Sequence, residues 1–110
     1  MSAATKTATA KTCPAWCAGD HADSADYRHH QGRGITPTFG LYASISWSEP
    51  LTATARAMDA GPKVFFKVGD GSLSLTAQQA TDLAEVMEEL ERDDAAGLLR
   101  DMVARIERAS

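Results

Sequence analysis

The chain has few large apolar side chains and almost no cysteine. Of its 110 residues only 18 are Leu, Ile, Val or Phe, whereas 20 are alanine and two are cysteine. The hydrophobic core must therefore be thin, and a disulfide-rich secreted scaffold is excluded. No stretch contains the roughly 18 consecutive apolar residues that a membrane helix needs. The length and the net charge of −4 indicate one small domain rather than a repeat array or a multidomain enzyme.

The first third of the chain has no core-forming residues. Between Ser2 and Gly34 there is no Leu, Ile, Val, Phe or Met. Residues 1–12 read MSAATKTATAKT, with two lysines and no apolar run of the kind that a signal peptide contains. We therefore expect residues 1–12 to be a flexible tail and the protein to be cytoplasmic. Residues 13–34 need a source of order other than apolar burial.

Every cysteine and histidine of the protein lies in this same region. They are Cys13, Cys17, His21, His29 and His30, all within 18 residues. Zinc takes four nitrogen or sulfur ligands in a tetrahedron, and its binding supplies folding free energy on the order of 10 kcal/mol. The spacing C-x3-C-x3-H, with a further histidine seven or eight residues later, predicts a zinc-binding loop over residues 13–34. The predicted ligands of this structural zinc are Cys13, Cys17, His21 and His29, or His30 in place of His29.

Other interpretations of the same residues are weaker. The cysteines could be ordinary thiols beside solvated histidines, or they could form a disulfide, which a reducing compartment disfavours. The C-x2-C spacing of redox motifs is absent, and so is the signature of zinc deaminases. A Cys-Cys-His site with a bound water stays open as an alternative. Around the site, Trp16 could shield the thiolates and Asp20 could hydrogen-bond a ligand histidine.

The middle of the chain predicts two β-hairpins. Phe39, Leu41, Ala43, Ile45 and Trp47 alternate with small or polar residues, which indicates a half-buried strand. A turn at residues 48–50 and a second strand at residues 51–57 would pair Trp47 with Leu51 and keep the apolar residues on one face. The second hairpin runs over residues 63–75, with Asp70-Gly71 as its turn, Val68 opposite Leu73 and Phe66 opposite Leu75. The segment VGDGSLS lacks the spacing and lysine of a phosphate-binding loop.

The end of the chain predicts two helices. Thr76 and Gln79 form a capping box before an apolar series at helical spacing, namely Ala80, Leu83, Ala84, Met87 and Leu90. Asp93 or Asp94 could cap a second helix, and Gly97 would weaken a continuous one. The acidic run between the two series is expected to be a solvated face. Together these elements predict an α+β fold over residues 35–110, a small antiparallel sheet of about four strands covered by one or two C-terminal helices and preceded by the zinc-bound loop.

The second helix carries an apolar stripe whose partner has to be identified. The stripe consists of Leu98, Leu99, Met102, Val103 and Ile106. It either lies beside the first helix on the sheet or pairs with the same stripe of a second chain. Since the expected second strand offers mostly alanine, a homodimer through the stripe is slightly favoured.

The segment CPAWCAGDH, a downstream histidine and the ending SLSLTAQQATDLAEVMEEL resemble a family of small uncharacterised actinobacterial proteins. The similarity covers most of residues 13–91. Members carry a CPxWC motif, a DH pair and a further histidine, so the resemblance implies that Cys13, Cys17, His21 and one of His29 or His30 occupy the family's positions. The resemblance implies no activity.

Three classes of function are compatible with these features. A non-enzymatic interaction or regulatory module with an unidentified protein partner ranks first, because no catalytic constellation is evident. A nucleic-acid binder would use basic residues around the zinc loop, namely Lys6, Lys11, Arg28, Arg33, Lys63 and Lys67. The isoelectric point near 5.2 opposes strong phosphate binding and ranks this class second. A small zinc hydrolase ranks third, because only Asp20, Asp23 or Asp26 could act as its base.

Overall fold

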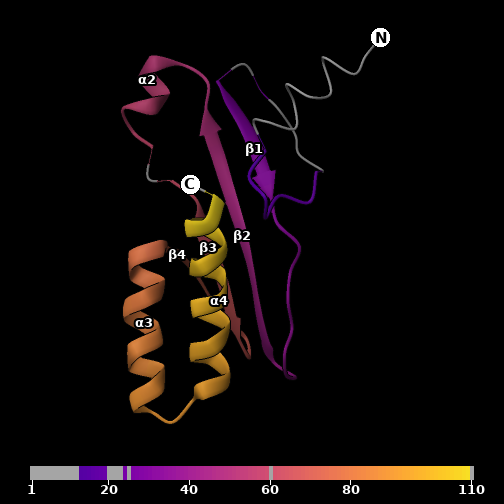
Figure 1. Ribbon diagram of the computed structural model, residues 1–110, viewed down its shortest axis with the longest axis vertical. Helices are drawn as coiled ribbons and strands as arrows, with labels where there is room; N and C mark the ends of the chain where they lie inside the picture. Colours follow the sequence, from indigo (N-terminus) through magenta and orange to yellow (C-terminus); the bar gives the residue numbers. More distant parts are fainter. Residues whose placement is uncertain (1–12, 20–23, 25, 60, 110) are drawn as a thin grey trace.

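The computed structural model describes residues 13–19, 24, 26–59 and 61–109. Four strands form one antiparallel sheet in the order β1-β2-β3-β4, and two long helices pack side by side on one of its faces (Figure 1). The elements are β1 (Tyr27–Gln31), β2 (Leu41–Pro50), α2 (Ala53–Arg56), β3 (Lys63–Val68), β4 (Gly71–Thr76), α3 (Ala77–Glu89) and α4 (Asp93–Ala109). The predicted α+β architecture, a four-stranded antiparallel sheet with C-terminal helices, is confirmed.

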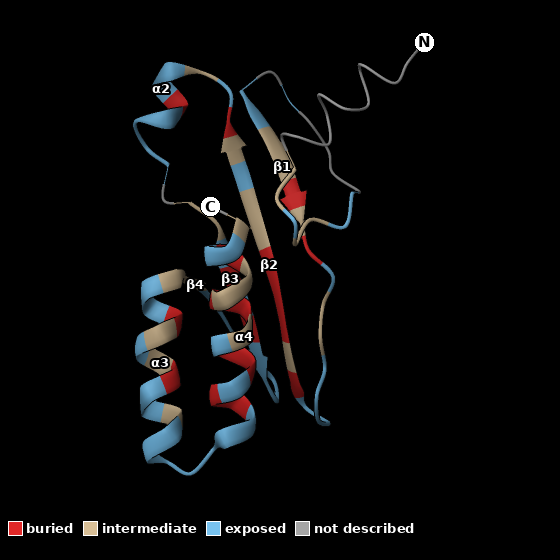
Figure 2. Cartoon of the chain, in the orientation of Figure 1, coloured by how far each residue is buried: buried red, intermediate tan, exposed pale blue. Residues whose placement is uncertain are grey.

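The core lies between the sheet and these two helices. Alternate residues of β2 point toward the helices, and Leu41, Ala43 and Ile45 are all at most 2% exposed. Val64 and Phe66 of β3 are buried beside them. Figure 2 shows the buried positions of α3 and α4 on the sides that face each other and the sheet. The expected two-residue period of β2 is therefore confirmed from Leu41 onward, whereas Phe39 precedes the strand and is fully exposed.

The expected second strand over residues 51–57 is wrong. Thr52 instead caps the short helix α2, and its side-chain oxygen accepts a hydrogen bond from the Ala55 N–H. Alanine is the best helix former, so a capped, alanine-rich segment can form a helical turn where no strand edge is available. The turn predicted at residues 48–50 is also wrong, because β2 continues to Pro50.

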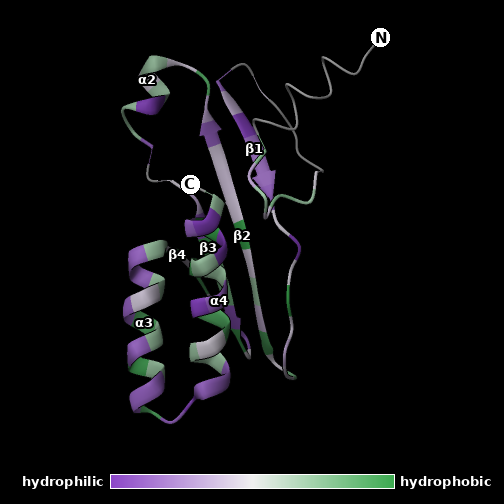
Figure 3. Cartoon of the chain, in the orientation of Figure 1, coloured by the Kyte–Doolittle hydropathy of each residue, from purple (hydrophilic) through white to green (hydrophobic). Residues whose placement is uncertain are grey.

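Both edges of β2 are paired with strands other than the expected one, β1 on one edge and β3 on the other. β1 lies antiparallel to the second half of β2, with Tyr27 opposite Pro50 and Gln31 opposite Ser46. This strand falls within the predicted zinc loop of residues 13–34. Figure 3 shows β1 as hydrophilic along its length, so apolar periodicity could not reveal it.

The hairpin of β3 and β4 is confirmed, but its register is shifted by two residues. Val68 lies opposite Gly71 and Phe66 opposite Leu73, so the turn is Gly69-Asp70 rather than Asp70-Gly71. Gly69 has φ of +56°, as the first central residue of a type II′ turn requires. Because the shift is even, the apolar residues stay on the predicted face.

The helices begin and end at identifiable signals. The capping box of Thr76 and Gln79 is present at the start of α3, as predicted. α3 ends in a Schellman motif, in which the Arg92 N–H bonds the Met87 carbonyl and the Glu91 N–H bonds the Glu88 carbonyl. Two helices are confirmed: the break lies at this motif, α4 begins with Asp93 and Asp94 in its first turn, and Gly97 lies inside α4.

Two side-chain predictions for this region have opposite outcomes. The acidic residues on either side of the break are exposed, as expected. Leu90 does not join the apolar series of α3, because it lies at the C-cap and is 64% exposed.

The apolar stripe of α4 is buried within the single chain. All five side chains belong to the hydrophobic cluster with β2, β3 and α3, and none is more than 8% exposed. The reason is that β2 and β3 present large residues such as Ile45 and Phe66, and not the alanines of the expected strand. The surface on which the predicted homodimer was based is therefore already occupied.

Within the described part of the chain, no helix combines the length and apolar character that crossing a membrane requires.

Candidate metal centre

The pairing of β1 with β2 separates the two adjacent histidines. Successive residues of a strand point to opposite faces of the sheet. His30 lies opposite Trp47 on the face that carries the core, and it is 0% exposed. His29 lies opposite Ser48 on the other face, where its Nδ1 is 3.3 Å from the Ser48 hydroxyl. Only one of the pair can therefore contribute to a site on the core side.

The segment that carries the cysteines is fixed to the end of β1. The Cys17 N–H donates to the Pro14 carbonyl at 3.0 Å, which closes a tight turn between the two cysteines. The next N–H, that of Ala18, donates to the Gln31 carbonyl at 2.9 Å, and Cys17 forms a β-bridge with Gly32. The segment thus lies along the strand and places both thiols over His30.

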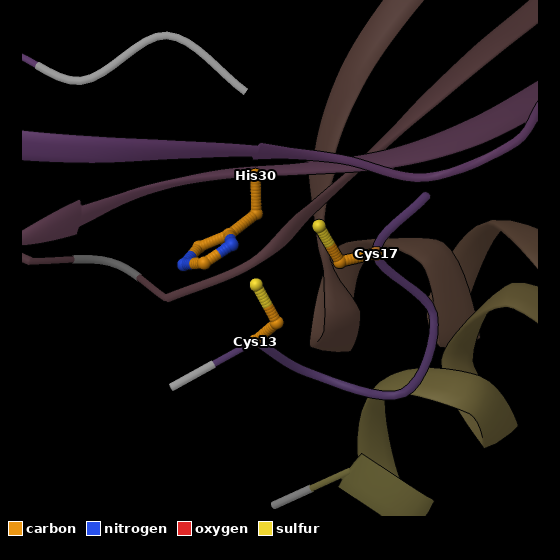
Figure 4. A group of neighbouring side chains, drawn as sticks. All are labelled: Cys13, Cys17 and His30. Atoms are coloured by element: carbon orange, nitrogen blue, oxygen red, sulfur yellow. The ribbon is translucent and has the colours of Figure 1, made fainter. Parts of the chain in front are cut away.

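The three side chains form a cluster of potential metal ligands. Cys13 Sγ, Cys17 Sγ and a ring nitrogen of His30 all lie within 4.8 Å of one another (Figure 4). Two sulfurs bound to one zinc ion at about 2.3 Å in a tetrahedron are about 3.8 Å apart, so small side-chain movements bring this cluster to coordination distance. Cys13, Cys17 and His30 could hold a metal ion.

The orientation of the His30 ring is set by three neighbours. Its Nε2 lies 2.7 Å from Oε1 of Glu49, so one nitrogen is engaged by a carboxylate. The indole of Trp47 stacks on the ring at 5.7 Å, and that of Trp16 meets it edge-on at 6.3 Å. Figure 4 shows the second nitrogen on the side of the two sulfurs. A carboxylate bonded to one nitrogen of a histidine, with the other nitrogen left to the metal, is the usual arrangement at metal sites.

The electrostatics of the cluster depend on whether a cation is present. Burial, followed by the neighbouring Cys17, raises the pKa of the Cys13 thiol, and the nearby charge of Arg28 opposes this. Without a cation the Cys13 thiol therefore stays protonated at neutral pH. A bound divalent ion reverses this preference because it stabilises the thiolates directly.

The predicted site residues have different outcomes. Cys13 and Cys17 lie together, and His30, the alternative to His29, joins them. His21, like Asp20, Asp23 and the tail of residues 1–12, lies outside the described residues.

Two neighbours of the cluster, Trp16 and Glu49, contact His30. Trp16 does contact the site, through the edge of His30. Glu49 was missed because it was assigned to a turn. Extending the two-residue period of Phe39 to Trp47 by one more step would have placed Glu49 on the same face as Trp47.

Comparison with known proteins gives a family but no activity. No curated protein and no solved structure matches the chain. A family model described as a domain of unknown function, DUF6907, matches residues 1–108. The chain therefore belongs to the DUF6907 family, which agrees with the resemblance to an uncharacterised family carried by CPAWC and the downstream histidines.

Proposed function

We propose that this protein is a non-enzymatic interaction or regulatory module in which one structural zinc ion fixes the N-terminal segment to the sheet. The observation that carries the proposal is the convergence of the two thiols and one nitrogen of His30, while the other nitrogen bonds Glu49. Two thiolates neutralise a divalent ion, and soft sulfur with imidazole nitrogen is the donor set that zinc prefers. The metal joins residues 13–19, which carry the two cysteines, to β1, which carries His30, and both of these segments have low hydrophobicity.

The fourth ligand is assigned to His21 on the basis of the sequence. It follows Cys17 by four residues, so a short loop can return it to the ion. A site closed by four protein ligands has no position for substrate, which supports a structural role over a hydrolytic one. The Glu49 carboxylate is bonded to His30 and acts as a positioning group rather than a base.

Metal content and ligand identity test the proposal together. Protein purified without a metal-affinity column should contain one zinc ion per chain by native mass spectrometry. Cobalt substituted for zinc should give thiolate-to-metal charge-transfer bands and the intense visible bands of a tetrahedral ion. Cys17→Ser and His30→Ala should each lose the metal or weaken its binding by at least a factor of ten.

The adjacent histidine supplies a matched control. His29→Ala removes the same side chain one position away, on the opposite face, and should retain a full equivalent of metal. Metal well below one equivalent in the parent, or equal losses in His29→Ala and His30→Ala, would contradict the proposal. His21→Ala should change the coordination number seen by cobalt, and an unchanged spectrum would favour water as the fourth ligand.

A further inference from the structure

The face of the sheet opposite α3 and α4 has a distinct composition. We call it the open face. It consists of the residues of β1 to β4 that alternate with the core positions. Both long helices lie on the other side of the sheet (Figure 1). The open face carries hydroxyl side chains, three aromatic rings, His29 and two lysines, and none of its strand residues is Asp or Glu.

The absence of acidic residues from these strand positions contrasts with the rest of the chain. Nine of the 15 acidic residues lie between Asp82 and Glu107, in α3, α4 and their connection. That acidic surface is separated from the open face by the whole thickness of the sheet. Since charges are screened over about 8 Å at physiological ionic strength, the helical carboxylates do little to cancel the lysines. The net charge of −4 therefore does not describe the open face.

An aromatic ring lies between the two lysines. Phe65 is 36% exposed, and Lys63 and Lys67 stand two residues away on either side of it, each about 6.7 Å along β3. The ring of Tyr42 meets that of Phe65 edge-on, with centroids 6.1 Å apart. Tyr42 in turn packs directly over Gly34, where any side chain would collide with its ring. The two aromatic side chains are thus held in place by their neighbours.

A cavity of about 300 Å³ lies at the end of the sheet where Lys63 lies, between the strands, α2 and the residues that follow α2. Tyr27, Ser48 and Lys63 of the open face line it, together with Trp47 of the core face and Asp59. The Asp59 carboxylate is the acidic group of this cavity, and its Oδ1 accepts hydrogen bonds from the Trp47 indole and the Gly61 N–H.

We propose that the open face binds single-stranded nucleic acid, with bases stacked on Phe65 and Tyr42 and phosphates bound by Lys63 and Lys67. Aromatic rings that a sheet presents between cations are the chemistry that recognises unpaired bases and their backbone. Phe65 is the exposed ring of the pair, and Tyr42 beside it is half-buried. The exposed hydroxyl side chains of Ser72 and Ser74 on β4 can bond base edges or sugars, whereas Ser44, opposite Phe65, is buried. The inference gives a partner to the interaction function proposed above and does not depend on the metal.

Binding of labelled homopyrimidine DNA and RNA oligonucleotides, followed by fluorescence anisotropy at increasing salt, tests the proposal. Each phosphate contact to a single strand contributes a slope of about −0.7 in log K against log salt, so the two lysines should give about −1.4. The double variant Lys63→Gln/Lys67→Gln should lose this slope. The control Arg100→Gln/Arg108→Gln makes the same change of charge on α4 and should bind as the parent does.

Stacking is tested separately at Phe65. Phe65→Leu should weaken binding by about tenfold, whereas Phe65→Tyr keeps a ring and should retain the affinity. Absence of binding at low salt, equal losses in the two double variants, an unchanged affinity of Phe65→Leu, or equally tight binding of polyglutamate would each overturn the proposal. A preference for RNA or DNA would support it and identify the strand. The metal content of each variant is measured in parallel, so a failure here is distinguishable from a failure of the zinc site.

Discussion

The N-terminal segment with β1 and the unit formed by β2 to β4 with α3 and α4 are ordered in different ways. Every buried residue of the hydrophobic cluster lies in the second region, from Leu41 of β2 to Ile106 of α4. The described residues 13–19 and β1 contribute only Trp16, as a partly buried neighbour of that cluster. They are held by backbone pairing with β2 and by the cluster around His30. One small domain thus combines an apolar core with a region whose order depends on polar contacts and, in our proposal, on a metal.

Removal of the metal should produce the largest difference between the two regions. With a chelator, we expect hydrogen–deuterium exchange to accelerate strongly in residues 13–19 and β1, because ligation on the order of 10 kcal/mol is what orders zinc-dependent segments. Protection in β3, α3 and α4 should persist, since their contacts are apolar. Uniform loss of protection over the chain, or none anywhere, would show that the two regions are not ordered independently.

A large-to-small substitution in the hydrophobic core tests the second region. Leu99 is 0% exposed, and Leu99→Ala should lower the free energy of unfolding by about 2–5 kcal/mol in urea denaturation. Leu90→Ala makes the same chemical change at a residue that is 64% exposed, and should alter stability by less than about 0.5 kcal/mol. Similar losses in the two variants would mean that the α4 stripe is not the centre of the core.

Loss of the carboxylate that positions His30 should have an intermediate effect confined to the first region. Glu49→Ala should weaken metal binding by about 10- to 100-fold, because the imidazole loses the partner that orients it. The chemical denaturation of the metal-free protein should change little. Ser48→Ala alters the neighbouring residue on the opposite face and is the control. Competition with a chromophoric chelator measures both, and equal affinities for Glu49→Ala and the parent would refute the positioning role.

The smallest effect is expected at the helix cap of the second region. The Thr76 side chain accepts a hydrogen bond from the Gln79 N–H, so Thr76→Ala should cost about 1 kcal/mol of stability and leave metal affinity unchanged. Thr81 instead bonds the carbonyl of Ala77 within α3, and Thr81→Ala should be neutral or slightly stabilising. Thermal denaturation of both variants distinguishes a threonine that caps the helix from one that lies inside it.

Prediction from the sequence succeeded where local patterns are strong. The capping box at Thr76, the apolar alternation from Leu41 to Ile45 and the hairpin after Val64 are readable because neighbouring residues determine them. It failed for β1 and for residues 51–57. In both segments the local signal is weak, and strand formation depends on whether a neighbouring strand edge is available. The edge of β2 was available to Tyr27–Gln31, and Thr52 directed the alanines into α2.

The sequence by itself determined that the chain has a cluster of potential metal ligands, a sheet and two helices, because spacing and periodicity are properties of consecutive residues. Only the tertiary structure decided which ligands meet. His29 and His30 are equivalent in spacing, and the side of the sheet on which α3 and α4 pack distinguishes them. Likewise, the burial of the α4 stripe and the lack of Asp and Glu among the strand residues of the open face follow from which face of each strand the helices cover. Side chains far apart in the sequence acquire a common environment only when the sheet aligns them.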